Sequence, residues 1–586
     1  MKKSSEPVPQ GTGSDGATGE ETVIAFSGFS FQYFAQAHPT LHDINLSVRK
    51  GEKILIAGPS GSGKSTLGHC LNGLIPFSYR GEVSGSLRIG GRETRELDIF
   101  QLSKVVGTVL QDPDGQFVGL TVNEDIAFAL ENDNVSLGPM RDRVARAAAL
   151  VGMEDFSISS PYELSGGQKQ RTSLAGVLID DVDILLFDEP LANLDPATGK
   201  AAIEIIDDIH HRTGKTVIII EHRLEDVLHR RVDRIIVMND GRIVADQCPD
   251  DLLSSPVLGE FGIREPLYVT ALKYAGVSVT PDMRPSHPEG LVLNGASGEL
   301  RRWHQSVKPS GAPPPAEPLL ELQDLRFSYN GVDPVVDQIS FRVDRGELMA
   351  IVGRNGAGKS TLSRLICGFE KEDAGRILYA GADIRDLTIK ERAEKIGVVM
   401  QNPNQMISKP LIFDEIALGL KLRGVGETEI EDRVERVMKV CGLAPFRKWP
   451  LSALSFGQKK RVTIASILVL NPEVLILDEP TAGQDLRHYT DIMEFIETIN
   501  RTGVAIILIT HDMHLMLEYA TRAVVIAGGK KIADAPPSAV LTDASVIELA
   551  NLKETSLYRL SQRAGIEDGT GFVQNFINHE RGLRIR

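Results

Sequence analysis

The sequence contains few cysteines, and none of them stands at a spacing that would hold a metal ion. Its four cysteines, Cys70, Cys248, Cys367 and Cys441, are scattered singly and form no CxxC pair. This pattern argues against a zinc ribbon, an iron–sulfur cluster or a disulfide framework, and it is typical of a protein from a reducing cytosol.

The sequence also lacks an apolar run long enough to cross a membrane, which takes about 18 residues. The longest apolar runs, such as Val217–Ile220 and Ala505–Ile509, have the length of single strands. In residues 1–20 two lysines are followed by no apolar stretch, so we expect a disordered tail there and no signal peptide. The chain is therefore predicted not to cross or enter a membrane by itself.

Basic residues are fewer than acidic residues. The 64 lysines and arginines are outnumbered by 79 aspartates and glutamates, which gives a formal net charge of −15. A surface for nucleic acid would have to overcome this balance locally, so we expect no nucleic-acid partner. The length of 586 residues suggests roughly four folding units at about 150 residues per domain.

What the sequence does contain is an internal repeat. The segment GEKILIAGPSGSGKSTL, which begins at Gly51, returns as GELMAIVGRNGAGKSTL from Gly346. Short apolar runs rich in β-branched residues alternate with helical patterns in each copy, which is typical of a parallel sheet covered by helices. We therefore predict two copies of one α/β module. The predicted buried strands are Lys53–Ala57, Ile184–Phe187 and Val217–Ile220, with Leu348–Val352, Val474–Leu477 and Ala505–Ile509 as counterparts.

Residues 266–318 separate the two copies. They include the run PSGAPPPAEP at 309–318, and their charges are balanced. Proline at this density prevents regular structure, so we predict a linker. Residues 551–586 contain no interpretable motif and are expected to form a C-terminal tail.

Each copy contains the motif G-x-x-x-x-G-K-[ST] between a predicted strand and a predicted helix, the context that identifies a phosphate-binding loop, or P-loop. Glycines let the backbone curl so that successive N–H groups point at phosphate oxygens, and the helix N-terminus adds partial positive charge. We expect Lys64 and Lys359 to neutralise the β- and γ-phosphates, and the Ser65 and Ser360 hydroxyls to bind Mg²⁺. Two such loops in register indicate a nucleotide-binding protein. The loop residues are Gly58, Pro59, Ser60, Gly61, Ser62, Gly63, Lys64, Ser65 and Thr66, and Gly353, Arg354, Asn355, Gly356, Ala357, Gly358, Lys359, Ser360 and Thr361.

Two acidic residues end an apolar strand in each copy, in the segments LLFDEP and LILDEP. The first acid, Asp188 or Asp478, suits the Mg²⁺ shell. The second, Glu189 or Glu479, suits the base that polarises an attacking water. A glutamate at this place implies hydrolysis rather than binding alone.

The segments LSGGQ at 164–168 and LSFGQ at 454–458, together with both P-loops, resemble the signature sequence of ATP-binding-cassette (ABC) ATPases. The resemblance covers residues 21–265 and 319–550. It implies two modules, each with a parallel-sheet core, an antiparallel β part and a helical subdomain, and it implies ATP and Mg²⁺ as cofactors. The signature residues expected to face ATP are Ser165, Gly166, Gly167 and Gln168, and Ser455, Gly457 and Gln458.

The family pairs two modules head to tail around two ATP molecules. One chain with both modules implies an intramolecular sandwich, in which Gly58–Thr66 would face Leu454–Gln458 and Gly353–Thr361 would face Leu164–Gln168. Phe456 departs from the family by replacing the first signature glycine, and its side chain would crowd the first site. Both sites keep the lysine, aspartate, glutamate and histidine, so we expect both to hydrolyse ATP, at rates that need not be equal.

The resemblance also assigns roles that spacing alone leaves ambiguous. Gln111 and Gln401 resemble the Q-loop glutamine, which senses Mg²⁺ and contacts the membrane partner. His222 and His511 resemble the switch histidine that touches the γ-phosphate.

Two further pairs follow from the same resemblance. Asp195 and Asp485 resemble the D-loop aspartate that couples the two sites. Tyr33 and Tyr329 fit the aromatic residue on which adenine stacks, with Phe34 as an alternative in the first copy.

Four classes of ABC protein compete for a chain of this kind. They are an importer motor with separate membrane subunits, a ribosome-associated tandem ATPase, a DNA-repair ATPase and a sugar-importer tandem ATPase. The acidic chain and balanced linker disfavour the ribosomal class, and the absence of zinc cysteines and of a long coiled coil disfavours DNA repair. In the sugar importers the second copy tends to be degenerate, whereas this one keeps Glu479 and His511.

The segments QDPDGQF at 111–117 and QNPNQM at 401–406 are similar to those of energy-coupling-factor (ECF) ATPases, with a variable helical subdomain as the alternative. In that family two ATPases join a transmembrane coupling protein and a small substrate-binding membrane protein to import vitamins or transition-metal ions. The resemblance therefore implies a peripheral protein on the cytoplasmic face of the membrane, with those two partners on separate chains. Members of that family with two fused modules resemble the ATPases of thiamine-precursor uptake or of cobalt and nickel uptake. No residue of this chain is expected to touch the transported solute, so the sequence does not identify it.

Overall fold

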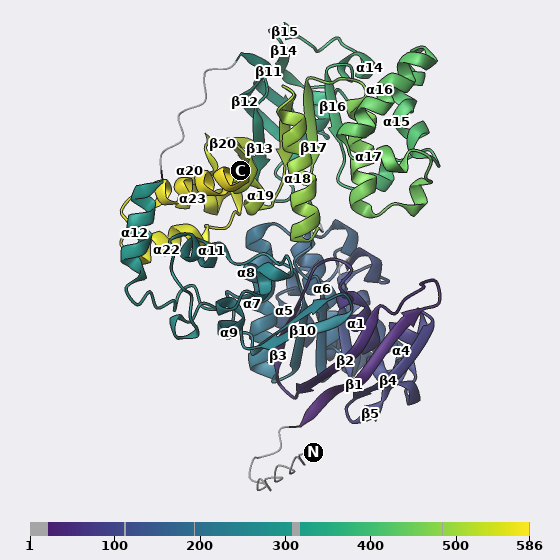
Figure 1. Ribbon diagram of the computed structural model, residues 1–586. Helices are drawn as coiled ribbons and strands as arrows, with labels where there is room; N and C mark the ends of the chain where they lie inside the picture. Colours follow the sequence, from purple (N-terminus) through teal and green to yellow (C-terminus); the bar gives the residue numbers. More distant parts are fainter. Residues whose placement is uncertain (1–20, 111–112, 193, 308–316, 483, 585–586) are drawn as a thin grey trace, which may run out of the picture.

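A computed structural model describes residues 21–110, 113–192, 194–307, 317–482 and 484–584. It contains two similar α/β modules, one built on residues 21–265 (module 1) and one on residues 319–550 (module 2) (Figure 1). The expected tail at 1–20 and most of the proline run at 309–318 lie outside the described residues.

Module 1 contains two sheets. An antiparallel sheet has the order β2-β1-β4-β5, and a six-stranded sheet has the order β10-β9-β3-β8-β7-β6, in which β10 alone is antiparallel to its neighbour. Most residues of β3 and β8 are isoleucine, leucine or valine, and both strands are buried along their whole length, as in a parallel sheet covered on both faces. The strands are β1 (Thr22–Tyr33), β2 (Leu41–Arg49), β3 (Lys53–Ala57), β4 (Gly81–Ile89), β5 (Arg92–Glu93), β6 (Val106–Val109), β7 (Ile184–Asp188), β8 (Thr216–Ile220), β9 (Arg234–Asn239) and β10 (Arg242–Gln247).

Helices cover the six-stranded sheet, and three of them form a helical subdomain before β7. That subdomain consists of α4, α5 and α6, which pack on one another. The helices of module 1 are α1 (Lys64–Leu71), α2 (Leu74–Phe77), α3 (Ile99–Ser103), α4 (Val122–Asn132), α5 (Leu137–Val151), α6 (Gly166–Leu178), α7 (Pro196–Thr213), α8 (Leu224–Val227), α9 (Pro249–Ser254) and α10 (Val257–Glu260).

Module 2 repeats this plan. Its sheets have the orders β12-β11-β14-β15 and β16-β17-β18-β13-β19-β20, and α15, α16 and α17 form its helical subdomain. Each of the six buried strands predicted from the repeat is present, which confirms the predicted fold class. The strands are β11 (Pro318–Phe327), β12 (Val336–Asp344), β13 (Leu348–Val352), β14 (Ala374–Tyr379), β15 (Ala382–Asp383), β16 (Ile396–Val399), β17 (Val474–Asp478), β18 (Ala505–Ile509), β19 (Arg522–Ala527) and β20 (Lys530–Ala535). The helices are α13 (Lys359–Cys367), α14 (Ile389–Arg392), α15 (Ile412–Lys421), α16 (Glu427–Val440), α17 (Phe456–Leu468), α18 (Leu486–Asn500), α19 (Met513–Tyr519), α20 (Pro537–Val540) and α21 (Ala544–Ala550).

The segment between the modules and the C-terminal segment fold together. Residues 266–318 were predicted to lack regular structure, and this is wrong for the part that precedes the proline run, which contains α11 (Leu267–Tyr274) and α12 (Ala296–Ser306). The expected C-terminal tail contains α22 (Ser556–Arg563) and α23 (Gly569–Arg584). We call α11, α12, α22 and α23 the four-helix unit; in Figure 1 these helices lie together at one edge of the two modules.

Aromatic contacts hold the four-helix unit together. The rings of Trp303 and Phe572 meet edge to face at 5.5 Å between centroids, and those of Tyr274 and Phe576 lie 5.6 Å apart. The Arg301 side chain donates a hydrogen bond of 3.0 Å to the carbonyl oxygen of Ala564. The prolines of the segment lie outside these helices, so they did not prevent the apolar faces of α11 and α12 from being buried in the core of module 2.

The four-helix unit and the stretch before it also connect the two modules. The amide of Leu267 donates to Glu225 Oε2 of module 1 at 2.8 Å, and Lys553 Nζ lies 2.6 Å from Asp226 Oδ1. Arg264 pairs with Glu518 of module 2 at 3.3 Å. Within the described ranges, no helix combines the length and apolarity needed to traverse a bilayer.

We predict that Phe572→Ala, which empties a fully buried position in the four-helix unit, destabilises module 2 by about 3–5 kcal/mol. Thermal unfolding of the full chain, followed by calorimetry, measures this effect. Phe100→Ala serves as the control, because that ring is 75% exposed and its removal should change stability by no more than about 0.5 kcal/mol. Equal unfolding temperatures for the two variants would show that the four-helix unit does not share the core of module 2.

Candidate functional site

Each P-loop connects the central strand of its sheet to a helix. The first joins β3 to α1 and the second joins β13 to α13, so the helix N-termini lie at the carboxyl ends of the parallel strands. Open α/β sheets bind ligands at this edge. The structure therefore places both predicted loops where a phosphate would be bound.

The glycines are required by the shape of the loops. Gly63 and Gly358 adopt φ values of 98° and 99°, a left-handed conformation that other residues rarely adopt. A side chain at Gly58 would collide with the backbone oxygen of Met238, and one at Gly353 with that of Ile526. Both loops thus pass directly against the end of the neighbouring strand.

The two P-loop lysines are buried and fold back over their own loops. Lys64 Nζ donates to the carbonyl oxygens of Gly58 and Pro59 at 2.8 and 2.9 Å. Lys359 Nζ donates to those of Gly353 and Arg354 at 2.7 and 2.9 Å. Burial lowers the pKa of both lysines, against the attraction of nearby carboxylates, with Glu189 foremost for Lys64 and Glu479 for Lys359. Each ammonium therefore lies within its phosphate cradle.

The predicted acidic pairs lie at the carboxyl ends of β7 and β17. Glu189 and Glu479 have φ values of 47° and 46°, so both are held in a left-handed backbone conformation that costs about 1–3 kcal/mol. The Glu189 amide donates to the carbonyl oxygen of Ile220, the last residue of β8, at 2.9 Å. The Glu479 amide donates to that of Ile509, the last residue of β18, at the same distance. The surrounding sheet therefore imposes the same backbone geometry on the two glutamates.

Burial raises the pKa of both aspartates, and it raises that of Asp188 to about 6. The Oδ1 atom of Asp188 is buried without a hydrogen-bond partner among the described residues. In module 2 the Ser360 hydroxyl donates to Asp478 Oδ2 at 3.4 Å. A buried carboxylate beside a hydroxyl is the oxygen donor set that Mg²⁺ prefers, so these residues fit a Mg²⁺ ion.

The two switch histidines lie two residues beyond the ends of β8 and β18, and their surroundings differ. His511 Nδ1 lies 2.6 Å from Glu479 Oε1, whereas His222 Nδ1 lies 3.1 Å from Glu221 Oε1. Burial lowers the pKa of His222. Burial acts in the same direction on His511, but the Glu479 carboxylate outweighs it and raises the pKa of that histidine.

The D-loop aspartates cross from each module to the P-loop of the other. The Ser60 amide of P-loop 1 donates to Asp485 Oδ2, and the Asn355 amide of P-loop 2 donates to Asp195 Oδ2 at 3.5 Å. Each aspartate also caps the helix that follows it, Asp195 through the amide of Thr198 and Asp485 through that of His488. The two modules therefore meet head to tail within one chain.

Both signatures begin a helix with the same cap. Ser165 accepts from the Gln168 amide at the start of α6, and Ser455 accepts from the Gln458 amide at the start of α17. Phe456 is 42% exposed at the first position of α17, so its side chain does not fill the protein interior. The apposition of each signature to the opposite P-loop stays a prediction.

The tyrosine hydroxyls reach the P-loop helices. Tyr33 Oη lies 3.1 Å from Thr66 Oγ1, and Tyr329 Oη lies 3.4 Å from Thr361 Oγ1. This places each ring beside the nucleotide loop of its own module, and stacking on adenine stays a prediction.

One Q-loop glutamine can be placed. Gln401 lines a pocket with Lys359, Asp478, Glu479 and His511, whereas Gln111 lies outside the described residues.

Three residues near the sites were missed by sequence reasoning. Lys460 is buried in α17, donates to the carbonyl oxygens of Met400 and Gln401 at 2.8 and 2.7 Å, and has its pKa lowered to about 8 by burial. Glu221 is buried beside His222. Asn551 donates to Asp195 Oδ1 at 2.8 Å. Comparison of the two copies could have pointed to two of these residues. Glu221 is charged where module 2 has Thr510, and Lys460 is charged where module 1 has Gln170.

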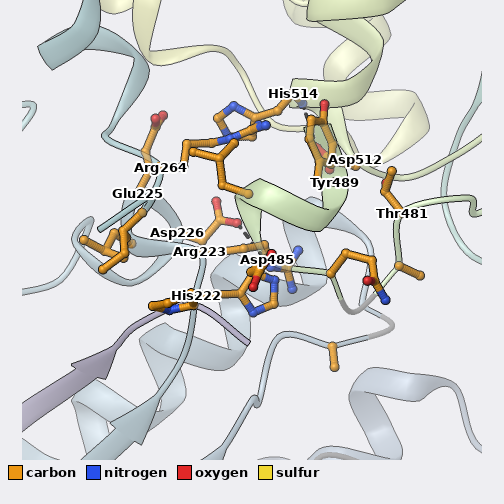
Figure 2. A pocket seen from close by; sticks show the side chains of 18 of the residues that line it. His222, Arg223, Glu225, Asp226, Arg264, Thr481, Asp485, Tyr489, Asp512 and His514 are labelled. Carbon is orange, nitrogen blue, oxygen red and sulfur yellow. Dashed lines mark hydrogen bonds and ion pairs between the residues drawn. The ribbon is translucent and has the colours of Figure 1, made fainter. Parts of the chain in front are cut away.

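A cavity lies between the modules where these elements converge (Figure 2). His222 and Asp226 of module 1 face Asp485 and Asp512 of module 2 across it, and Arg264 extends into it from the stretch before the four-helix unit. The two candidate sites are therefore joined by one shared interface.

Comparison with known proteins agrees with this geometry. A family model described as "ABC transporter" matches residues 41–192 and 336–482, and a model described as "ATP-binding cassette cobalt transporter" matches residues 255–327. A putative ABC transporter ATP-binding protein of Clostridium perfringens (strain 13 / Type A) is 57% identical over 564 residues, which cover 96% of this chain and 99% of the relative. A putative ABC transporter ATP-binding protein of Enterococcus faecalis is 55% identical over 574 residues, or 97% of this chain and 100% of the relative.

Among solved structures, cbiO1 from Clostridium perfringens, described as part of the ABC transporter complex cbiONQ, is 33% identical and has a TM-score of 0.38. It covers 43% of this chain and 98% of its own length. The sequence matches establish the family, and the repeated model accounts for both modules. The chain belongs to the ABC transporter family, as an ATP-binding protein with two ATPase modules in tandem.

Proposed function

We propose that this chain is the ATP-hydrolysing motor of an ECF-type membrane importer whose transmembrane subunits are separate chains. The observation that carries the proposal is the crossing of Asp195 and Asp485 onto the opposite P-loops. Because each nucleotide loop is contacted by the other module, ATP binding at either loop acts on the interface. Closure driven by ATP and release by hydrolysis is a two-state change biased by a ligand.

The site residues take the roles that their chemistry suits. Lys64 and Lys359 bind the β- and γ-phosphates, and backbone amides of the P-loops hold the remaining phosphate oxygens. Glu189 and Glu479 orient and deprotonate the attacking water.

Mg²⁺ would be held by Ser65 and Asp188 in module 1 and by Ser360 and Asp478 in module 2. Gln401 lines the pocket of the second site, and Gln111 is its counterpart in the sequence. When bound, the ion neutralises charge on the β- and γ-phosphates.

Exposed apolar residues on module 1 supply a surface for a membrane partner. Leu120 is 80% exposed and Ile158 is 86% exposed. Their segments run side by side, since the amides of Val122 and Asn123 donate to the carbonyl oxygens of Ser159 and Ser157 at 3.0 Å. Large apolar side chains gathered on a surface favour contact with another protein.

Module 2 has a comparable surface at the matching place. Leu411 and Trp449 are 40% and 48% exposed, and the amide of Ile412 donates to the carbonyl oxygen of Trp449 at 3.4 Å. Two similar but non-identical surfaces fit a transmembrane coupling protein that presents two different segments to the cytoplasmic face of the membrane.

A transition-metal ion such as cobalt is the cargo that the comparisons favour. The support is the match of residues 255–327 to the model described as a cobalt transporter. A small substrate-binding membrane protein would select the cargo, and a vitamin such as a thiamine precursor is the alternative outcome.

We predict that Glu189→Gln and Glu479→Gln each remove the part of the ATP hydrolysis rate that their own site contributes. In the double variant the rate should fall at least about 100-fold. The reason is that the amide cannot accept a proton from the attacking water. Phosphate release by the purified full chain measures this.

Binding of a fluorescent ATP analogue should be retained in all three variants. Glu96→Gln, at an exposed position remote from the P-loops, is the control and should hydrolyse ATP at the wild-type rate. Wild-type activity in either single variant would disprove the role of that glutamate.

We predict that Ile158→Glu reduces recovery of this chain with solubilised membranes by about tenfold or more, because a buried unpaired carboxylate is costly at an interface. The tagged wild-type chain should co-purify with two small hydrophobic proteins, identified by mass spectrometry. Phe100→Glu is the matched control, since Phe100 is 75% exposed on the same module.

Recovery of ribosomal proteins in place of membrane proteins would contradict the importer and favour a translation-factor role. Loading of the recovered complex with radioactive cobalt, compared with labelled thiamine precursor, distinguishes the two cargoes.

A further inference from the structure

The residue before the switch histidine differs between the modules. Glu221 follows β8, whereas Thr510 occupies the matching position after β18. The Glu221 side chain is fully buried, although a buried carboxylate is costly unless it is hydrogen-bonded. A carboxylate retained at such a position needs a structural or functional reason.

Three backbone amides satisfy the Glu221 carboxylate. His222 N and Arg223 N donate to Oε1 at 2.8 and 3.2 Å, and Leu191 N donates to Oε2 at 3.3 Å. The Leu191 amide belongs to the loop that follows the catalytic acids of β7. Glu221 therefore ties the start of the switch segment to that loop.

In module 2 the catalytic glutamate itself makes the corresponding contacts. Glu479 Oε1 accepts from the His511 amide at 3.0 Å and lies 2.6 Å from His511 Nδ1. The Thr510 hydroxyl donates to Glu479 Oε2 at 3.2 Å. In module 1 the matching amide and ring nitrogen of His222 lie at 2.8 and 3.1 Å from Glu221 Oε1.

Charged groups from several elements lie around Glu221. Lys64 from the P-loop helix and Arg223 from the switch segment supply positive charge, and Asp188 and Glu189 supply negative charge. The Arg223 guanidinium donates to the carbonyl oxygen of Leu191, the residue whose amide Glu221 binds. The loop after β7 and the switch segment are thus joined twice, once through each side chain.

We propose that Glu221 is the positioning residue of the switch histidine in module 1, the part that Glu479 plays toward His511 in module 2. His222 is then oriented by a residue other than the catalytic glutamate of its site. The two ATP sites are consequently built differently: in the second, one carboxylate serves both the water and the histidine, and in the first, two carboxylates divide these tasks. This inference rests on the role given to Glu189 under the proposed function and on the expected role of His222 as the switch histidine.

The test uses the full chain with Glu479→Gln, so that hydrolysis reports the first site. We expect Glu221→Ala to lower kcat about 10–100-fold with KM for ATP changed less than about threefold, because a misplaced histidine affects the reaction more than binding. Glu221→Gln, which keeps one oxygen to accept from the His222 and Arg223 amides but loses the acceptor for the Leu191 amide, should recover part of the lost kcat.

The control is Glu96→Gln in the Glu479→Gln chain. Glu96 is exposed and has no assigned part in either site, so kcat of the first site should change less than about threefold. Should Glu221→Ala fail to fold, Glu221→Asp, which draws the carboxylate back by one methylene, replaces it in the comparison with Glu221→Gln. If Glu479→Gln abolishes ATP hydrolysis at both sites, the same substitutions are compared in the otherwise wild-type chain.

Three results would overturn the inference: wild-type kcat in the folded Glu221→Ala and Glu221→Asp chains, no recovery with Glu221→Gln, or an equal loss with Glu96→Gln. A failure of the glutamate roles is distinguishable, because the Glu189→Gln and Glu479→Gln double variant would then still hydrolyse ATP. A failure of the importer assignment would appear in the membrane co-purification and would leave these kcat values unchanged.

Discussion

Two aspartate side chains, each bound to a P-loop of the opposite module, hold the interface on which the rest of the molecule depends. Asp485 accepts from the Ser60 amide and Asp195 from the Asn355 amide. Burial opposes ionisation of Asp485, yet the amides of His488 and Ser60 lower its pKa. A carboxylate in this position depends on amides from both modules, so binding at a P-loop is coupled to the contact between modules.

The four-helix unit makes this pairing intramolecular. It buries its apolar faces in the core of module 2 and reaches module 1 through the amide of Leu267. Lys553, in the stretch between α21 and α22, also binds module 1. Asn551, just before α22, binds the same Asp195 that contacts P-loop 2. A chain that carries both modules and this unit therefore joins the modules by side-chain contacts as well as by the covalent connection.

Much of this was predictable from the sequence, because the repeat set the P-loops, the acidic pairs and the switch histidines in register on strands that are apolar throughout. Residues 267–306 and 556–584 were not, since their helices are stabilised by contacts such as Trp303 with Phe572, which are far apart in sequence. Glu221 and Lys460 differ in charge from their counterparts Thr510 and Gln170, but this difference alone does not predict their burial. A single charged residue at a strand end or in a helix predicts a solvent-exposed side chain, and only the packing of the neighbouring module elements reveals its burial.

The central claim is that the two ATP sites form within one chain, and the most direct test measures mass and nucleotide together. The Glu189→Gln and Glu479→Gln double variant, which should bind ATP without hydrolysing it, is analysed with ATP and Mg²⁺ by light scattering and by equilibrium dialysis. We predict the mass of one chain with two ATP molecules bound. A mass of two chains that appears only with ATP, or one ATP per chain, would contradict the account, because the modules would then pair between chains or form a single site.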